Sequence, residues 1–423
     1  MAVLFSIPLE RGCSVKVLFV TSAYPSNESD PRGNFVHRLA RGIQREGAGV
    51  TVIAPGAPFA LSNEILEGVN VQRARYWIPR WQNLTAGFGG IVPSLRNRPW
   101  LLLQVPCMIS ALTWKALRLS RHYDVIHAHW LYPAGIAGSI ACARHKVPLI
   151  VTSHGSDAAM AQRYPPLRWL SARICRSASA CVGVSHAVTK SLVELGAPPE
   201  HTSFIPLGVD LVDSERFDSV DESPDFLRFK TFDGFRMVFI GRMVSLKSIE
   251  TLLDAHSELE QRGHRVACAL IGSGPSQDSL RAIARRNRSH NIIFAGLLPT
   301  AVTQQWLSAG HVLVLPSVSE GRGIVILEAM AQGLPAVVSD IPGPRELVDD
   351  GVTGFVFPPK DVEGLANRLE ELIQSERLRR EMGRRARQFV EIEALTTEDS
   401  ARKYLALYER LVSGRKARSH PSP

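Results

Sequence analysis

The stretch HVLVLPSVSEGRGIVILEAMAQGLPAVVSD, residues 311–340, decides the fold. It begins with a short apolar run, passes through a loop with two glycines, continues as an apolar helical pattern and ends in a second apolar run, PAVVSD. Buried strands that alternate with helices are typical of a parallel α/β sheet. The segments before it, FRMVFIGR (235–242) and VACALIGSGP (266–275), repeat the order of strand, turn and helix.

The first half of the chain has the same alternation. VKVLFV (15–20), VTVIAP (50–55) and DVIHAHW (124–130) are short apolar runs, and NFVHRLARGIQREG (34–47) is a helical pattern with one apolar face. Two α/β halves of similar size therefore follow each other, each of the doubly wound, Rossmann-like type. We predict an α/β protein of two Rossmann-like domains that face each other across a cleft.

The domain boundaries follow from where this alternation pauses. The join lies near FIPLGVD (204–210), ahead of an acidic stretch without apolar periodicity. We place an N-terminal domain at residues 14–208 and a C-terminal domain at residues 209–396. Residues 68–123 of the first domain are interpreted as an insertion. The last segment, 397–423, is predicted to form an amphipathic helix that packs back on the N-terminal domain, followed by a frayed tail.

Composition excludes several protein classes. A chain of 423 residues with 45% hydrophobic and 21% charged side chains fits two folded domains and neither a disordered nor a collagen-like protein. Six cysteines without a CxxC spacing favour a reducing compartment. No run of 18 apolar residues occurs and the first 20 residues make a poor signal peptide, so we expect a cytoplasmic protein.

The net charge of +9 is unevenly distributed. Residues 1–210 hold 21 Lys and Arg against 11 Asp and Glu, whereas the remainder holds 28 against 29. Residues 68–123 contain eight Lys and Arg, no acid and four of the seven tryptophans. We favour peripheral contact of this basic, Trp-rich segment with the anionic inner face of the cell membrane. The alternatives are nucleic acid, which we do not expect, and an ordinary surface with solvated arginines and core tryptophans.

Two cations follow the apolar run at 235–242. Arg242 ends the predicted strand, and Lys247 comes five residues later at the start of a helix. The helix dipole and the free amides of the first turn add to the two charges, so this segment can bind an anion such as a diphosphate. The alternative is an ordinary surface Arg and Lys at a helix start.

The loop within residues 311–340 supplies two carboxylates. Glu320 lies beside Gly321 and Gly323, whose missing side chains allow a ligand to approach the backbone. It can accept hydrogen bonds from a bound sugar. Glu328 stands in an otherwise apolar helix, where a carboxylate needs hydrogen-bond donors such as two neighbouring ribose hydroxyls. The alternative is an exposed Glu320 and a Glu328 held in a salt bridge.

Three histidines belong to predicted strands or strand ends of the first half. His154 ends a strand in TSHGSD, which places it at the cleft, and His127 and His129 share one face of another strand. Strand histidines are usually structural, so we select His154 first and His129 second. The HxH spacing could bind a metal, but no third ligand completes the pattern.

Together these motifs resemble glycosyltransferase family 4, the retaining enzymes with the GT-B fold. In the second half the similar segments are GRMVSLKSIETLLDAHSEL, ALIGSGP, IIFAGLL, residues 311–340 and LVDDGVTGFVFPPKD. In the first half they are YPSNESDPRGNFVHRLARGIQREGAGVTVIAP, DVIHAHW, VTSHGSD and FIPLGVD. The resemblance covers nearly the whole chain except its ends and residues 60–120.

The resemblance implies a nucleoside diphosphate sugar as donor and assigns roles to the catalytic candidates. Arg242 and Lys247 would bind the diphosphate and neutralise it as it leaves. Glu320 would hold the donor sugar and Glu328 the ribose, while His154 would lie beside the anomeric carbon.

Further contacts are expected on both sides of the cleft. On the acceptor side the candidates are His129 and Asp157. Additional donor contacts are expected in the glycine loops and at the start of the apolar helix, from Gly33, Gly241, Gly272, Gly274, Leu297, Gly321, Gly323 and Ile324.

The resemblance also implies the reaction class. A hexose-type sugar would pass with retention to a glycan or lipid-linked acceptor in polysaccharide or glycolipid synthesis. Two fixed cations and a helix N-terminus can stabilise the leaving diphosphate in place of a metal ion, so we predict no metal and no other cofactor. Glu320 and Glu328 are not interpreted as a glycosidase acid and nucleophile. The oligomeric state is expected to be a monomer or a weak dimer.

One residue departs from the family's pattern. Arg322 stands where the family usually has an aromatic side chain. Three alternatives remain open: a glycosyltransferase for a small soluble acceptor, a GT-B sugar-nucleotide epimerase, and an inactive binding protein, which only Arg322 suggests.

Overall fold

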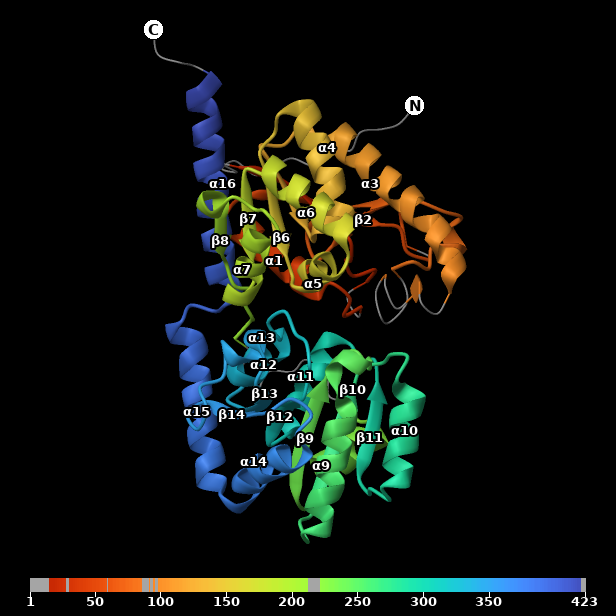
Figure 1. Cartoon of the computed structure of the whole chain (residues 1–423), viewed down its shortest axis with the longest axis vertical. Helices are drawn as coiled ribbons and strands as arrows, with labels where there is room; N and C mark the ends of the chain where they lie inside the picture. Colours follow the sequence, from red (N-terminus) through yellow and green to blue (C-terminus); the bar gives the residue numbers. More distant parts are fainter. Residues whose placement is uncertain are drawn as a thin grey trace.

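The computed structural model shows two α/β domains, one above the other in Figure 1. It describes residues 15–27, 30–58, 60–85, 91, 94–95, 98–211 and 221–419. The N-terminal 14 residues, most of the acidic stretch after the join and the last four residues of the tail lie outside this description. Two Rossmann-like domains were predicted, and the architecture confirms them.

The N-terminal domain is built on an eight-stranded sheet with the order β3-β4-β2-β1-β5-β6-β7-β8. Neighbouring strands are parallel, except the edge pair of β3 and β4, which is antiparallel. The strands are β1 (Lys16–Thr21), β2 (Gly49–Pro55), β3 (Asn63–Leu66), β4 (Val69–Ala74), β5 (Val125–His129), β6 (Leu149–Ser153), β7 (Ala180–Gly183) and β8 (Thr202–Phe204).

Helices cover both faces of this sheet, which is why the central strand β1 is buried along all but its first residue. Leu18 and Val20 face a core shared with α3 (Gln104–Ser120) and α4 (Ile136–His145). Phe19 faces a core shared with α1 (Asn34–Arg45) and the C-terminal helix α16 (Thr397–Ser419). The helical segments of the domain are α1 (Asn34–Arg45), η1 (Pro79–Trp81), η2 (Pro99–Leu103), α3 (Gln104–Ser120), η3 (Leu131–Gly135), α4 (Ile136–His145), α5 (Ser156–Arg163), α6 (Pro165–Ser177), α7 (His186–Glu194) and η4 (Pro199–His201).

Strand β4 and helix α3, at the two ends of residues 68–123, are part of this framework, which corrects the interpretation of the whole segment as an insertion. Strand β4 pairs with β2 and β3 inside the sheet, and α3 packs against α4, β2 and β4. Together η2 and α3, Pro99–Ser120, are long and apolar enough to cross a membrane, with a mean hydropathy of 1.3 and 28% of the most apolar window buried. One face of α3, formed by Met108, Leu112 and Ala116, is fully buried in the core of the N-terminal domain.

The C-terminal helix α16 (Thr397–Ser419) runs along the N-terminal domain, beside α1 (Figure 1). A Cβ added to Gly42 of α1 would lie 3.0 Å from Cγ2 of Thr397, so the two helices approach closely at this glycine. Tyr404 and Tyr408 of α16 are fully buried in the core that Phe19 joins. The last helix therefore completes the N-terminal domain, although it follows the C-terminal one in sequence.

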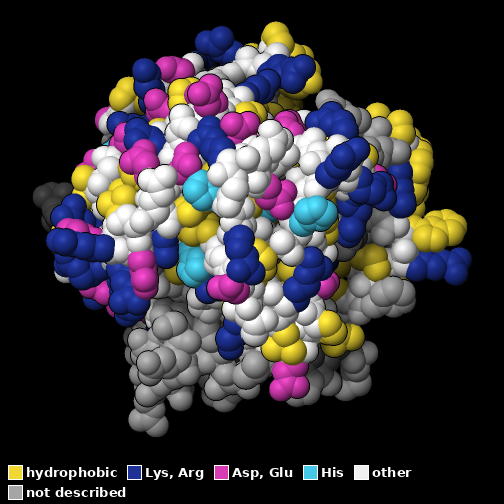
Figure 2. Space-filling view, turned by 90° about the horizontal axis from the view of Figure 1, so that it is seen from below, with side chains coloured by type: hydrophobic (Ala, Val, Ile, Leu, Met, Phe, Trp, Pro, Cys, Tyr) yellow, Lys and Arg dark blue, Asp and Glu magenta, His cyan; other side chains and the backbone are white. Residues whose placement is uncertain are grey.

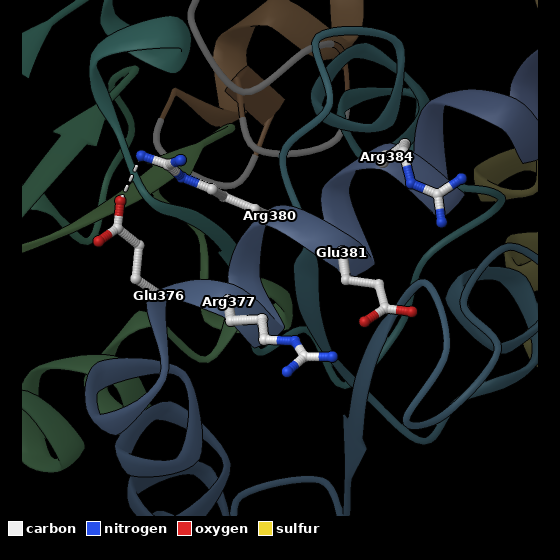
Figure 3. Close-up of a pocket in the computed structure, with 5 residues that line it drawn as sticks. All are labelled: Glu376, Arg377, Arg380, Glu381 and Arg384. Atoms are coloured by element: carbon white, nitrogen blue, oxygen red, sulfur yellow. Dashed lines mark ion pairs between the residues drawn. The ribbon is translucent and has the colours of Figure 1, made fainter.

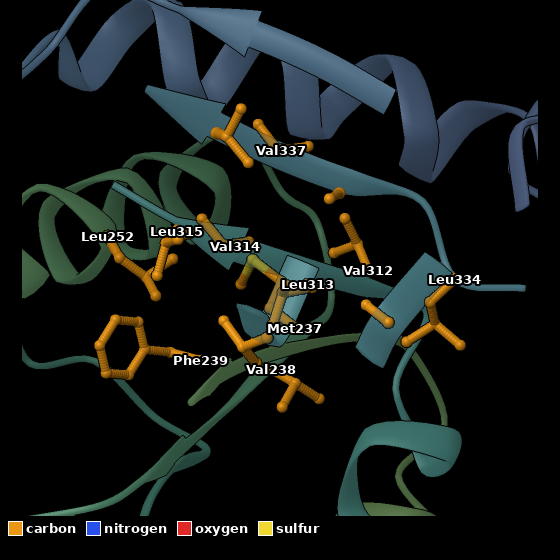
Figure 4. Packing of buried hydrophobic residues seen from close by; sticks show 14 of the residues in the cluster. Met237, Val238, Phe239, Leu252, Val312, Leu313, Val314, Leu315, Leu334 and Val337 are labelled. Carbon is orange, nitrogen blue, oxygen red and sulfur yellow. The ribbon is translucent and has the colours of Figure 1, made fainter. Parts of the chain in front are cut away.

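The C-terminal domain is built on a six-stranded parallel sheet with the order β11-β10-β9-β12-β13-β14. Its central strands carry aliphatic side chains that pack against flanking helices, as Figure 4 shows for Leu315 and the helix residue Leu252. The strands are β9 (Phe235–Ile240), β10 (Val266–Ile271), β11 (Ile292–Gly296), β12 (Val312–Leu315), β13 (Ala336–Ser339) and β14 (Gly354–Phe357).

The helices of this domain connect the strands in the expected alternation. The helical pattern after residue 361 divides into two helices at Ser375, whose hydroxyl accepts a hydrogen bond from the amide of Leu378 and caps the second helix. The helical segments are α8 (Pro224–Lys230), η5 (Ser245–Lys247), α9 (Ile249–Gln261), α10 (Gln277–Arg286), α11 (Thr300–Ala309), α12 (Ile324–Ala331), α13 (Pro342–Arg345), α14 (Val362–Gln374) and α15 (Glu376–Ile392).

Candidate active site

The candidate site of the C-terminal domain lies where its strand order reverses. Strands β10 and β11 lie on one side of β9, and the chain then returns to place β12 on the other side. The loops after β9 and β12 therefore diverge and leave a crevice at the carboxyl edge of the sheet. The amide of Val318 donates to the carbonyl of Leu246 over 2.9 Å, which joins the two loops.

This crevice brings together the cations and the carboxylate that the sequence placed after separate strands. Lys247, from the β9 loop, forms an ion pair with Glu320, from the β12 loop, and each side chain is less than 20% exposed. Part of the Arg242 side chain is exposed, but the protein atoms around it desolvate its guanidinium and lower its pKa, and Glu320 opposes this shift. Two cations thus stand beside one carboxylate, an arrangement that can hold a polyanionic ligand.

Glycines allow the neighbouring loops to approach each other. A Cβ at Gly272 would lie 2.0 Å from the carbonyl oxygen of Gly241, and one at Gly274 would lie 2.3 Å from that of Met243. The structure therefore gives Gly272 and Gly274 a packing role at this edge. Leu297, the other donor candidate at this edge, is exposed directly after β11.

The two domains meet at a pair of glycines next to Glu320. A Cβ at Gly155 would lie 2.7 Å from the Cα of Gly321, and a Cβ at Gly321 would lie 2.3 Å from the carbonyl oxygen of His154. The hydroxyl of Ser185 also donates to the carbonyl of Gly321 over 2.9 Å. His154 of the first domain thus lies beside the Glu320 loop of the second, as a site shared by two domains requires.

Helix α12 begins at this contact. Gly323 precedes it with a φ of 79°, a left-handed conformation that glycine adopts without steric cost. The amide of Ile326 donates to the carbonyl of Gly323 over 2.8 Å. The amides of Ile324 and Val325 precede the first bond of the helical ladder, so they can donate to a ligand in the crevice.

Glu328 forms an ion pair across the domain boundary. Its carboxylate accepts a hydrogen bond from the guanidinium of Arg38 over 2.6 Å, and each side chain is 12% exposed. Nearby, the Asn34 amide donates to the Thr300 hydroxyl over 2.9 Å. The salt-bridged alternative for Glu328 therefore describes this structure, although the sequence did not indicate Arg38 as the partner. A hydrogen bond to one carboxylate oxygen leaves the other for a ligand hydroxyl.

Gly33 sets the start of α1 at the same boundary. Its φ is 69°, and a Cβ would lie 2.5 Å from the carbonyl oxygen of Ala23. Only glycine fits both constraints. The first turn of α1, with Asn34 and Arg38, consequently reaches the C-terminal domain.

The three histidines of the first domain lie close together but differ in their contacts. His127 is bonded on both nitrogens, to the hydroxyls of Tyr408 and Thr152, at 2.7 and 2.8 Å, which indicates a structural role. His129 Nδ1 and His154 Nε2 are 3.2 Å apart. Burial lowers the pKa of His154 to about 3 and that of His129 well below its usual value, so both rings are neutral.

Asp157, predicted as an acceptor contact, faces inward. It is 3% exposed and accepts hydrogen bonds from the amide of Leu131 and the hydroxyl of Ser153, at 2.8 and 2.7 Å. Burial raises the pKa of its carboxyl group, and these hydrogen bonds oppose the shift. Its role in this structure is to brace the loop after β5 against β6.

Arg322, the departure from the family's pattern, takes part in the domain contact. It is 6% exposed, donates to the carbonyl of Val184 over 2.9 Å and lies over the ring of Phe204 at 5.1 Å. Burial lowers the pKa of its guanidinium to about 10, and Glu346 opposes this shift. The carboxylate of Glu346 itself accepts from the amides of His186 and Ala187 at the start of α7. These contacts direct Arg322 into the boundary between the domains.

The described residues show no group of three or more His, Cys, Asp and Glu side chains that could hold a metal ion. A surface depression lies away from the crevice, on the outer face of α15, where Arg380 pairs with Glu376 (Figure 3). This depression is open to solvent and lined by one helix. The candidate catalytic residues lie instead in the crevice at the carboxyl edge of the sheet, where Glu320 and Glu328 form their ion pairs.

The basic segment of the first domain presents an apolar and cationic surface. The outer side of η2 and α3 carries Trp100, Leu103 and Trp114, each at least half exposed. Arg118 lies over the Trp114 ring, and Arg80 of η1 lies over Trp81. By contrast, the face seen from below has Lys and Arg interspersed with Asp and Glu (Figure 2).

Not every arginine of residues 68–123 belongs to this surface. Arg73 is 2% exposed, pairs with Glu64 and donates to the carbonyl of Pro25. It therefore cannot meet a membrane. Arg75 and Arg98 are exposed, and Arg96 lies outside the described residues.

Both halves of the chain match known protein families. Residues 228–389 match the model described as glycosyl transferases group 1, and residues 33–213 match the model of glycosyltransferase family 4. D-inositol 3-phosphate glycosyltransferase of Kribbella flavida is 31% identical over 299 residues, which are 66% of this chain and 69% of that protein. The chain belongs to glycosyltransferase family 4. A second relative, TuaC of Bacillus subtilis, named as a teichuronic acid biosynthesis glycosyltransferase, is 28% identical over 361 residues, covering 83% and 87% of the two chains.

Solved structures confirm the GT-B fold for this family 4 member. Anabaena HepE in complex with UDP and glucose is 20% identical, with a TM-score of 0.72 and coverage of 94% of this chain and 100% of that one. Sucrose-phosphate synthase of Thermosynechococcus elongatus is also 20% identical, with a TM-score of 0.73 and the same coverage. At this identity the likeness concerns the fold, so donor and acceptor must be argued from the site.

Proposed function

We propose that this glycosyltransferase moves a hexose-type sugar from a nucleoside diphosphate sugar to a glycan or lipid-linked acceptor at the cytoplasmic face of the membrane. The observation that carries the proposal is the convergence of Lys247, Arg242 and Glu320 at the strand reversal of one domain, with His154 of the other domain alongside. A cleft between two domains can hold a donor on one side and an acceptor on the other.

The diphosphate is assigned to Arg242 and Lys247. In the free protein Lys247 is neutralised by Glu320, so an incoming diphosphate shares the lysine with this carboxylate. Cleavage of the sugar–phosphate bond builds negative charge on the leaving group, and two fixed cations with the α12 amides stabilise that charge where it develops. HepE is solved with UDP and with UDP and glucose, which supports a uridine diphosphate sugar as the first donor to test.

The sugar and the ribose are assigned to the two glutamates. Glu320 lies at the domain contact beside His154, where it can accept from sugar hydroxyls, and Glu328 can accept from the ribose through the oxygen that Arg38 does not engage. Retention of the anomeric configuration follows in this proposal from attack on the face that the diphosphate leaves. Neither glutamate is required as a covalent nucleophile.

A donor assay tests this proposal. The protein is incubated with UDP-, GDP- or ADP-sugars and a membrane lipid extract, and release of nucleoside diphosphate is measured. We expect release with one nucleotide class, increased by the acceptor extract. No release with any donor contradicts the proposal, and release of an epimerised nucleotide sugar without transfer supports the epimerase alternative.

Activity is expected to be independent of divalent metal ions. Arg242 and Lys247 supply the positive charge that a metal would otherwise provide at the diphosphate. Removal of metal with EDTA should therefore leave kcat and the donor KM unchanged in the same assay. Loss of activity that Mg²⁺ or Mn²⁺ restores would contradict the metal-free mechanism.

Membrane contact is assigned to the outer side of η2 and α3. Trp100, Leu103 and Trp114 can enter the interface between headgroups and acyl chains, while exposed arginines meet the phosphates. Residues 68–123 contain no acid, so nothing within the segment neutralises these cations. Because this surface belongs to the domain assigned to the acceptor, docking would bring a lipid-linked acceptor towards the cleft.

A charge-matched pair of variants tests the membrane contact. Replacing Arg75, Arg80, Arg98 and Arg118 with glutamine should release the protein from anionic vesicles, since each cation near such a surface contributes about 1 kcal/mol. The control replaces four arginines of α15, all exposed, with glutamine: Arg377, Arg380, Arg384 and Arg385. Cosedimentation with vesicles at low and high salt is the measurement.

The two variants have the same net charge and should differ in vesicle binding. Activity on a short soluble acceptor should persist in both. If both bind vesicles equally well, or if the wild type does not bind at all, the membrane assignment is wrong and the alternative of a soluble acceptor is favoured.

A further inference from the structure

Three histidine rings form a compact row inside the N-terminal domain. The centroids of His127 and His129 are 4.2 Å apart, and the rings of His129 and His154 are nearly parallel at 5.4 Å. His127 ends the row with both nitrogens bonded, to Tyr408 and Thr152. The rings of His129 and His154 share one hydrogen bond, which uses one nitrogen of each ring. The second nitrogen of each ring takes no part in it.

The contact between His129 and His154 leaves two buried nitrogens without a hydrogen-bond partner in the part of the chain that the structure describes. His129 Nδ1 and His154 Nε2 are 3.2 Å apart, a distance that one proton can bridge. Nε2 of His129 and Nδ1 of His154 are buried and have no hydrogen-bond partner among the described residues. His129 is fully buried, whereas His154 is half-buried beside Gly321 of the opposite domain.

Both rings are neutral, because burial lowers the pKa of His154 to about 3 and that of His129 well below its ordinary value. A neutral imidazole carries one proton, so two arrangements are possible. In the first, His154 donates from Nε2 and His129 holds its own proton on Nε2. In the second, His129 donates from Nδ1 and His154 holds its proton on Nδ1.

The two arrangements differ in where the unpaired N–H lies. The first leaves it on Nε2 of His129, whose whole side chain is buried inside the N-terminal domain. The second leaves it on Nδ1 of His154. This nitrogen is also buried in the free protein, but its half-buried ring lies at the domain boundary beside Gly321, so an oxygen of a substrate bound between the domains can accept from it. A buried donor without an acceptor is costly, and only the second arrangement lets a ligand remove this cost.

We propose that His129 is a positioning residue that holds His154 in the tautomer with the proton on Nδ1. His154 then presents a neutral N–H to an oxygen of the donor sugar or of its acceptor. This inference rests on the proposed function for the identity of the ligand, but not for the tautomer, which the free protein already has. In this role His154 is a fixed hydrogen-bond donor and exchanges no proton during transfer.

Nitrogen-15 NMR of the ¹⁵N-histidine-labelled protein tests the tautomer without substrate. Two-bond correlations distinguish an imidazole protonated on Nδ1 from one protonated on Nε2, and the His154 signals are identified by their loss in His154→Asn. The wild type should show His154 protonated on Nδ1. His129→Phe keeps a ring but removes the donor, so His154 should shift to the Nε2 form that a free imidazole prefers.

Two further variants separate positioning from packing. His129→Asn places an amide near the former Nδ1 and should retain the Nδ1–H form, whereas His127→Phe removes a neighbouring ring and should leave the His154 tautomer unchanged. In turnover assays His129→Phe should lower kcat/KM about tenfold, the effect of one misplaced hydrogen bond, and His129→Asn should recover most of it.

These experiments test the tautomer of His154 independently of the proposed glycosyltransferase activity. A wild-type His154 protonated on Nε2 overturns the inference, even if donor transfer occurs. A tautomer that His129→Phe does not change also overturns it. If His129→Phe does not fold, the wild-type and His129→Asn spectra still give the test. Correct tautomers with no activity on any nucleotide sugar would count against the proposed function and leave this inference standing.

Discussion

Replacing Lys247 with alanine is expected to lower kcat by on the order of 100-fold, with Arg242→Ala having a comparable effect. Each substitution removes a fixed positive charge at the place where the leaving diphosphate gains negative charge, and loss of one such partner costs about 3 kcal/mol of transition-state stabilisation. Steady-state kinetics with a saturating donor measure the change.

The fold should survive these substitutions. Lys247 lies in the short segment η5 and forms an ion pair with Glu320, while Arg242 is exposed. The exposed Lys190 of α7 is a suitable control, because Lys190→Ala removes one positive charge away from the crevice. Near-normal turnover of Lys247→Ala or Arg242→Ala would show that the diphosphate is not bound there.

Glu328→Gln is expected to raise the Kd for a free nucleoside diphosphate on the order of 10-fold to 100-fold. The carboxylate is assigned to the ribose, and hydrogen bonds to a charged group contribute about 1.5–3 kcal/mol. Glu320→Gln should leave the affinity for free nucleotide within a few-fold of wild type but lower turnover of the sugar donor, because it is assigned to the sugar. Calorimetric titration with nucleotide and turnover of the full donor separate the two effects.

Glu328→Gln also disturbs the ion pair with Arg38, so this variant needs a matched control. Arg38→Gln breaks the same pair but keeps the carboxylate. We expect Arg38→Gln to retain most of the affinity for free nucleotide. Equal losses in Arg38→Gln and Glu328→Gln would mean that the domain contact, rather than a ribose contact, governs binding. Equal losses of affinity for free nucleotide in Glu320→Gln and Glu328→Gln would contradict the assignment of Glu320 to the sugar and Glu328 to the ribose.

The periodicity of the sequence predicted the strands that form the centre of both sheets, since these are apolar runs buried on both faces. Strands β3 and β4 were missed because NEIL and VNVQRA are short and partly polar. The sequence signal for β4 is that every second residue is buried. This alternation places Arg73 on the same buried face as Val69 and Val71. Reading residues 68–123 by charge alone therefore assigned Arg73 to the surface.

The sequence predicted the position of those candidate site residues that come directly after a recognisable strand. Arg242 and Lys247 come after β9 and Glu320 after β12, and the strand order brings these loops together. The partner of Glu328 was not predictable, because Arg38 is 290 positions away on another domain. The inward orientation of Asp157 depends on the loop after β5, which one sequence does not specify.

The most direct test of the donor assignment is a thermal-shift titration of the wild type and of Glu328→Gln with UDP, GDP and ADP. Binding at 100 times Kd stabilises the native state by about 2.7 kcal/mol. For domains of this size that corresponds to a rise in Tm of roughly 5–10 °C. We predict that one nucleotide raises the Tm of the wild type by this amount and that the rise is largely lost in Glu328→Gln. No shift with any of the three nucleotides, or an equal shift in both proteins, would contradict a nucleoside diphosphate site at the crevice.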